Sequence, residues 1–374
     1  MWDLVKGVAT VFKTQKVNTD STIFKLHYQI TFCLILIFTL ILAANQYVGN
    51  PIKCMHHMGG KSDKPSPTDE VLDTYCWIHM TYTVTSAFYK EAGIEVAFPG
   101  VDSTKGNKED VKVYRFYQWV SFCLAFQAVL FYAPRWLWKI WEGGKLQALK
   151  MDLDIAIISD GDKKQKEKMM LEYLENNLYY HNLWAFKYIF CEFLALVNVI
   201  GQMFLMDRFF DGEFLTYGIK VVEFMQSDQE DRVDPMIYIF PRMTKCTFFK
   251  YGLSGEVERH DSICILPLNI VNEKIYIFLW FWCIILGCLT VLLLAYRIAT
   301  IVSYRLRCAL FKMHYRNVNG DDIDTIVGNT RFGDWYLLYM IGINIDAGVF
   351  REVFHELAQK IGYDTSEKSR LNAV

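Results

Sequence analysis

The sequence predicts an all-α membrane protein with four transmembrane helices, two disulfide-stapled extracellular loops and a helical cytoplasmic domain. Three observations predict this fold class. Four apolar stretches are each long enough to cross a bilayer, which takes about 20 residues at about 1.5 Å per residue. Two long loops between these stretches each carry one pair of cysteines. Basic residues gather in the remaining regions, so both cysteine loops are expected on the extracellular side.

Composition agrees with a chain that lies only partly in lipid. Hydrophobic residues make up 53% of the 374 residues and aromatic residues 16%, which is high for a soluble protein. Charged residues reach 21%, so a large part of the chain must fold outside the bilayer. The formal net charge of -2 and the lack of a basic arm indicate no nucleic-acid partner.

The expected spans follow from the apolar stretches. The first covers residues 26–47 and the second 116–133. The third, 184–206, is interrupted by polar residues, and a buried helix of a soluble protein has a similar pattern. An even number of spans is nevertheless needed to return the second cysteine loop to the side of the first. The fourth, 275–296, contains no charged residue.

Orientation follows from the positive charges that flank the spans. The N-terminal segment 1–25, the loop 134–183 and the C-terminal region 297–374 hold these charges, which places them in the cytoplasm. The loops 48–115 and 207–274 carry more acidic than basic residues and are expected outside the cell.

The helical cytoplasmic domain is predicted from periodicity. One face of a helix over residues 349–361 would carry five apolar side chains: Phe350, Val353, Phe354, Leu357 and Ile361. In the loop, a polar run at 159–168 precedes the helix-like segment 169–180. Together these segments are expected to pack as one domain.

The ten cysteines divide into two sets. Six lie in expected spans or in the cytoplasm, where a thiol packs as a small apolar group or stays reduced. These are Cys33, Cys123, Cys191, Cys283, Cys288 and Cys308. The extracellular set is Cys54, Cys76, Cys246 and Cys264. Four cysteines allow three pairings, so two bridges within the loops and two bridges between them both remain open.

Two further features concern polar groups near the membrane. Glu192 lies inside the third span, where facing lipid is costly, so we expect a hydrogen-bonding or charged partner. Structural pairing and a proton relay are both interpretations of Glu192. The first dozen residues are amphipathic at helical spacing, and such a helix can lie on the membrane surface.

No pattern predicts an enzyme. The sequence contains no phosphate-binding loop, nucleophile elbow or catalytic carboxylate pair. His56 and His57 are adjacent, which is not the spacing of a helix-borne metal pair, and zinc would compete for Cys54. We therefore expect no catalytic residue, no metal and no cofactor.

A family resemblance enters at the start of the second span. Phe116, Tyr117, Gln118, Trp119 and Val120 resemble the YYQWV signature of innexins, the invertebrate gap-junction proteins, with Phe116 replacing the first Tyr. Further stretches similar to arthropod innexins cover both loops and all spans: 46–51, 73–78, 134–144, 211–213, 244–251 and 264–282. Two cysteines per loop, rather than the three typical of connexins, point the same way. Viral innexins look alike at this level.

The resemblance implies a subunit of an oligomeric large-pore channel in the plasma membrane. Such a channel works as a gap junction, a hemichannel or both, and passes ions and small molecules. The subunits would form a homo-oligomeric hexamer or octamer, or mix with other innexins, and dock with a ring in the neighbouring cell. A four-pass adhesion or barrier protein without a pore is the alternative.

The resemblance also assigns residues. It implies that Cys54 pairs with Cys264 and Cys76 with Cys246. In innexins the N-terminal segment folds into the pore mouth, so the pore-lining residues here would be Trp2, Asp3 and Lys6. A ring of Asp3 carboxylates would favour cations.

Overall fold

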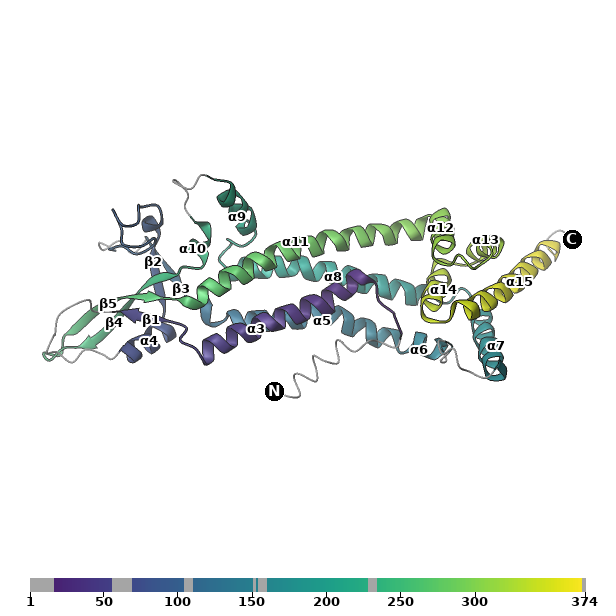
Figure 1. Ribbon diagram of the computed structural model, residues 1–374, viewed down its shortest axis with the longest axis horizontal. Coiled ribbons are helices and arrows are strands. Elements are labelled where there is room, and N and C mark those ends of the chain that lie inside the picture. Colours follow the sequence, from purple (N-terminus) through teal and green to yellow (C-terminus); the bar gives the residue numbers. More distant parts are fainter. Residues whose placement is uncertain are drawn as a thin grey trace. The chain divides into compact units, whose positions relative to one another are not determined.

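The computed structural model describes residues 17–55, 69–103, 110–150, 153, 160–227 and 234–371. Two compact units divide the chain, and we describe each by itself. The sheet unit contains residues 32–129 and 199–285. The helical unit contains residues 1–31, 130–198 and 286–374. Figure 1 gives the order of the elements along the chain.

Four helices of the described chain are long and apolar enough to cross a membrane, which confirms the predicted fold class. They are Thr22–Tyr47, Val120–Glu142 (α5), Asn182–Phe209 (α8) and Pro267–Val302 (α11). The first, third and fourth helices begin before the expected apolar stretch, whereas the second begins later. The second, third and fourth helices end beyond it. Residues 116–118 form a short 3-10 turn instead, and α5 continues through Pro134 to Glu142.

The first of these helices changes its winding along its length. It begins as α2 (Thr22–Lys25), widens into a π-helix, η1 (Leu26–Thr31), and continues as α3 (Phe32–Tyr47). The hydroxyl of Thr31 donates to the carbonyl of Leu26 at 2.9 Å, within the wide turn. His27 is buried there, and its Nε2 lies 2.8 Å from Oγ1 of Thr290. Wide turns of this kind are uncommon and often accompany functional positions.

A five-stranded antiparallel sheet, which the sequence analysis does not predict, forms the centre of the sheet unit. Its order is β1 (Lys53–Met55), β5 (Val257–Ile265), β4 (Met243–Tyr251), β2 (Thr81–Val84) and β3 (Val111–Tyr114). The strands of the first cysteine loop thus flank a hairpin from the second loop on both sides. Three helices belong to the same unit: α4 (Asp69–Ile78), α9 (Tyr217–Gln226) and α10 (Pro235–Ile239).

Helices other than the membrane spans surround an apolar core in the helical unit. They are α6 (Lys145–Lys150), α7 (Asp160–Asn176), α12 (Tyr304–His314), α13 (Gly320–Asn329), α14 (Phe332–Asn344) and α15 (Ala347–Leu371). The predicted face of α15 is confirmed, because all five of its apolar side chains are buried. The polar run at 159–168 is helical, since α7 begins at Asp160.

Candidate functional site

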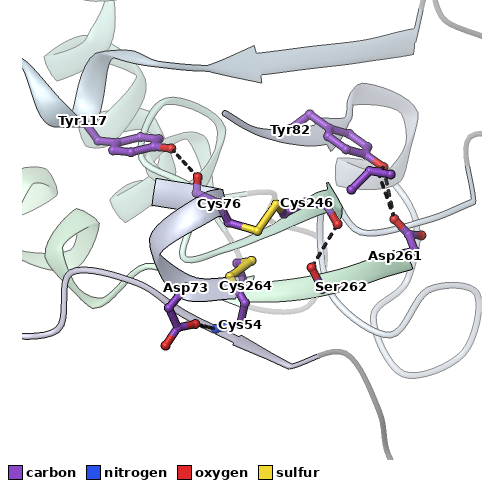
Figure 2. Close-up of a disulfide and its surroundings, with 10 residues drawn as sticks. Cys54, Asp73, Cys76, Tyr82, Tyr117, Cys246, Asp261, Ser262 and Cys264 are labelled. Carbon is purple, nitrogen blue, oxygen red and sulfur yellow. Dashed lines mark hydrogen bonds between the residues drawn. A yellow bond between two sulfur atoms is a disulfide. The ribbon is translucent and has the colours of Figure 1, made fainter. Parts of the chain in front are cut away.

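Two disulfides join the two cysteine loops. Cys54 of β1 is bonded to Cys264 of β5, and Cys76 of α4 is bonded to Cys246 of β4 (Figure 2). This is the pairing that the resemblance implies. All four cysteines are buried, and the bonds span separations of 210 and 170 residues. Closing such long loops removes much of the entropy of the unfolded chain.

Polar groups around the disulfides hold the backbone of the cysteines (Figure 2). The carboxylate of Asp73 accepts from the Cys54 amide at 2.6 Å. The hydroxyl of Ser262 donates to the Cys246 carbonyl at 3.0 Å. Tyr117 donates its hydroxyl to the Cys76 carbonyl at 3.4 Å. These three backbone groups therefore each have a hydrogen-bond partner at a buried site.

The family signature connects the disulfide region to α5. The buried ring of Tyr117 lies against Trp77, with centroids 4.8 Å apart. The side-chain amide of Gln118 donates to the carbonyl of Trp77, and Val120 is buried at the start of α5. Trp119 is exposed. Three of the four residues from Tyr117 to Val120 thus have a structural role within the unit.

Phe116 lies in an aromatic cluster that explains why it needs no hydroxyl. Its ring centroid is 5.2 Å from that of Phe210 and 6.0 Å from that of Phe240. Phe240 stacks on Tyr276 of α11 at 5.6 Å. Edge-to-face and stacked pairs of this kind stabilise a core beyond the area that they bury. The replacement of Tyr by Phe is therefore compatible with this site.

An acidic pair lies near the start of α11. Asp234 caps α10, and its carboxylate accepts from the amide of Met236 at 2.9 Å. Burial raises the pKa of Asp234, and the charge of Glu273 raises it further. The guanidinium of Arg242 lies 3.8 Å from Asp234 and 3.1 Å from Glu273, so one cation serves both carboxylates.

In the helical unit, Glu192 of α8 forms a buried ion pair with Arg297 of α11. Arg297 donates from Nε to Oε2 at 2.8 Å and from Nη2 to Oε1 at 2.9 Å. Oε1 also accepts the hydroxyl of Ser21 at 2.8 Å. The rings of Tyr188 and Tyr336 lie 5.6 and 5.3 Å from the guanidinium carbon. A two-pronged, fully partnered geometry offsets the cost of burying both charges.

Asp20, the residue before Ser21, belongs to a second buried ion pair. Arg135 of α5 donates from Nη1 to Oδ1 of Asp20 at 3.1 Å. Asp20 also accepts the hydroxyls of Tyr28, at 2.7 Å, and Thr19, at 2.8 Å. The segment from Thr19 to Ser21 is thereby bonded to α5 and α8, and through Glu192 indirectly to Arg297 of α11. We call the residues of the two pairs, with Ser21, the linker network.

Sequence reasoning identified only part of the linker network. It singled out Glu192 and expected a partner, and the structure supplies Arg297, Ser21 and no free carboxylate oxygen. In the sequence, Arg135 and Arg297 belong to the basic regions that predict the orientation of the spans, and no pairing was expected of them. The sequence feature that could have indicated a pairing role for Arg297 is its position, because it directly follows the charge-free stretch and continues the same helix.

Other predicted site residues fall outside the described chain. These are Trp2, Asp3 and Lys6. His56 and His57, for which the sequence predicts no metal site, also lie outside the described residues. The described chain begins at Val17, beside the linker network. Asn18 is held there by Asn344 of α14, whose side-chain amide donates to the Asn18 carbonyl at 2.9 Å.

These features define a class of protein: four membrane-spanning helices whose two cysteine loops are joined into one disulfide-bonded sheet. The innexin family model matches residues 20–361. The chain is 58% identical to Innexin shaking-B of Drosophila melanogaster, over 97% of this chain and 96% of that protein. It is 47% identical to Innexin inx1 of Schistocerca americana, over 96% and 98% of the two chains. The chain therefore belongs to the innexin family.

Family membership establishes the function in general terms. Innexins are gap-junction channel proteins, so this chain is a subunit of an oligomeric large-pore channel of the plasma membrane. The pore-less adhesion protein is thereby set aside. The family is one of channels and not of known enzymes.

We predict that loss of one disulfide weakens the sheet unit without preventing membrane insertion. Cys76→Ser should lower the free energy of unfolding by about 2 to 5 kcal/mol and abolish docking. Thermal unfolding of the solubilised protein measures the first effect, and junctional conductance the second. Cys288→Ser removes an exposed free thiol and should change neither. Recovery of a peptide linking Cys54 to Cys76 from non-reduced protein would contradict the pairing.

We predict that Glu192→Gln lowers the free energy of unfolding by about 3 to 5 kcal/mol, because Arg297 then stays buried without its counter-charge. Adding Arg297→Gln should restore part of the loss. Glu175→Gln is the matched control, since its pair with Lys360 is exposed, and should change stability by no more than about 0.5 kcal/mol. Thermal unfolding checks all of these variants, and a loss in the double variant equal to the sum of the Glu192→Gln and Arg297→Gln losses would argue against coupling.

Proposed function

We propose that this innexin assembles as a closed ring, a hexamer or octamer of identical subunits or a mixture with other innexins. Four helices of one subunit do not enclose a large aqueous pore, and cyclic symmetry closes the wall with one repeated interface. Exposed apolar side chains on each spanning helix support this arrangement, for example Leu40, Phe122, Phe193 and Ile285. In a ring, such faces contact lipid or a neighbouring subunit.

The proposed topology places residues 1–25, 134–183 and 297–374 in the cytoplasm. The loops 48–115 and 207–274 then lie outside the cell, and the spans are 26–47, 116–133, 184–206 and 275–296. Two arguments support it: the basic residues that flank the spans, and the two disulfides between the loops, because disulfides form and persist in oxidising compartments.

We predict that epitope tags at Asp160 and Val374 stay hidden from antibody on intact cells and become visible after permeabilisation. A tag after Lys105, in the first cysteine loop, is the matched control and should stain without permeabilisation. Surface staining at Asp160 or Val374 would overturn the four-pass topology.

We further propose that the N-terminal segment lines the cytoplasmic mouth of the pore, with Trp2, Asp3 and Lys6 near the constriction. The supporting observation is the linker network, which fixes the chain at Asp20 and Ser21 against two spanning helices, α5 and α8. An anchored end limits where the preceding residues reach. The competing interpretation is an amphipathic helix on the membrane surface.

We predict that Asp3→Lys lowers the permeability of cations relative to anions. The change replaces one negative charge per subunit with a positive one beside a narrow, low-dielectric path, which opposes cation entry. The measurement is the reversal potential of single hemichannels in asymmetric KCl. Surface expression is the control and should stay normal. An unchanged reversal potential at normal surface density would favour the surface-helix interpretation.

The sheet unit is the proposed docking element for a ring in the neighbouring cell. It contains both extracellular loops as one disulfide-bonded body, so the loops are presented in one fixed arrangement. Preorganisation of this kind reduces the ordering cost of association.

A further inference from the structure

Helix α9 has an apolar surface wider than the part that the protein covers. Its buried residues are Tyr217, Gly218 and Val221. Beside them runs an exposed stripe, and its members are 53%, 39% and 75% exposed: Ile219, Val222 and Met225. These positions are three residues apart and so lie along one side of a helix. Lys220 and Glu223 occupy the remaining arc, which makes α9 amphipathic.

Close packing fixes the position of α9 along α11. Gly218 lies directly against the indole of Trp280, so that even a methyl group at Gly218 would overlap the ring. The indole Nε1 of Trp280 donates to the carbonyl of Leu215 at 3.2 Å. Figure 1 shows α9 beside the first half of α11. The helix is therefore held at the level of Trp280.

On the proposed topology, that level lies inside the bilayer surface. Lys274 is the last charged residue of α11 before the charge-free stretch 275–296. Trp280 is six residues further along the helix, about 9 Å at 1.5 Å per residue. Amphipathic helices of the membrane interface bury their apolar face about 5 to 10 Å deep, between headgroups and acyl chains. The depth of α9 matches this range.

We propose that α9 is an interfacial helix whose stripe of Ile219, Val222 and Met225 contacts phospholipid acyl chains. The assignment to the outer leaflet rests on the proposed topology. The spanning helices of the same unit also carry exposed apolar side chains, for example Phe204 and Phe281. Its polar edge suits the headgroup layer, because Lys220 pairs with Glu213 at 2.6 Å and keeps its ammonium partly exposed.

A lipid fits the stripe better than a second protein surface does. Specific protein interfaces bury about 800 Å² on each partner, far more than three side chains present. They also concentrate aromatic residues, methionine and arginine, and of these the stripe has only Met225. Aliphatic side chains and methionine are compatible with disordered acyl chains.

The test places a nitroxide on α9 in the full-length channel, reconstituted in phosphatidylcholine vesicles. Val222→Cys is labelled in a Cys288→Ser background, which removes the exposed free thiol, and the unsubstituted background gives the residual labelling. Power-saturation spectroscopy compares access of oxygen, which concentrates in lipid, with access of a water-soluble nickel chelate. We expect oxygen to dominate at position 222 and again with Ile219→Cys. The chelate should dominate with Glu223→Cys, because position 223 belongs to the polar arc of the helix.

Two results would overturn the proposal. Low access of both reagents at positions 219 and 222 would mean that a neighbouring subunit covers the stripe. Dominant access of the nickel chelate there would mean that the stripe faces water. Conductance of the same vesicles is measured in parallel, so that a failure of channel assembly is recorded separately from the location of α9.

Discussion

The ion pair between Glu192 and Arg297 is the interaction on which the helical unit depends. Water does not reach these groups, so each charge must find its partners within the protein. The carboxylate uses both oxygens on Arg297 and receives Ser21 as well, while two tyrosine rings flank the guanidinium. Because Tyr336 belongs to α14, the pair connects two spanning helices, the linker network and α14. None of these elements can shift without exposing a charge to an apolar surrounding.

The sheet unit reaches a similar rigidity by covalent means. Its strands come from both loops. β4 and β5 have nine residues each, but β1 has only three, too few for strand pairing alone to hold it. The disulfides fix β1 to β5 and α4 to β4. Tyr117 and Gln118 then attach α4 to the start of α5. The signature residues thus transmit the position of the disulfides to a spanning helix within this unit.

Hydropathy was enough to predict the helices, because lipid imposes a length of about 20 apolar residues. The joining of the two loops was predicted only by the family resemblance, since the positions of four cysteines leave three pairings open. The sheet could not be predicted in this way. Its strands contain charged residues such as Lys245 and Glu258, and its pairing joins segments far apart in the sequence. The role of Arg297 was hidden for a different reason. A basic residue at the end of a span satisfies the orientation rule whether or not it also pairs, so composition alone does not separate the two roles.

The linker network also fixes the chain close to the first described residue, Val17. Asp20 and Ser21 are held by charge-assisted hydrogen bonds to Arg135 and Glu192, and each such bond contributes more than a neutral one. Asn18 is held by two hydrogen bonds between its backbone and the side chain of Asn344, and its Oδ1 accepts from the ammonium of Lys25 at 2.6 Å. The described chain is therefore restrained from Asn18 onward by side chains of the helical unit. Any movement at Asp20 or Ser21 must break a hydrogen bond to a buried charge, so the linker network is the most strongly restrained part of this segment.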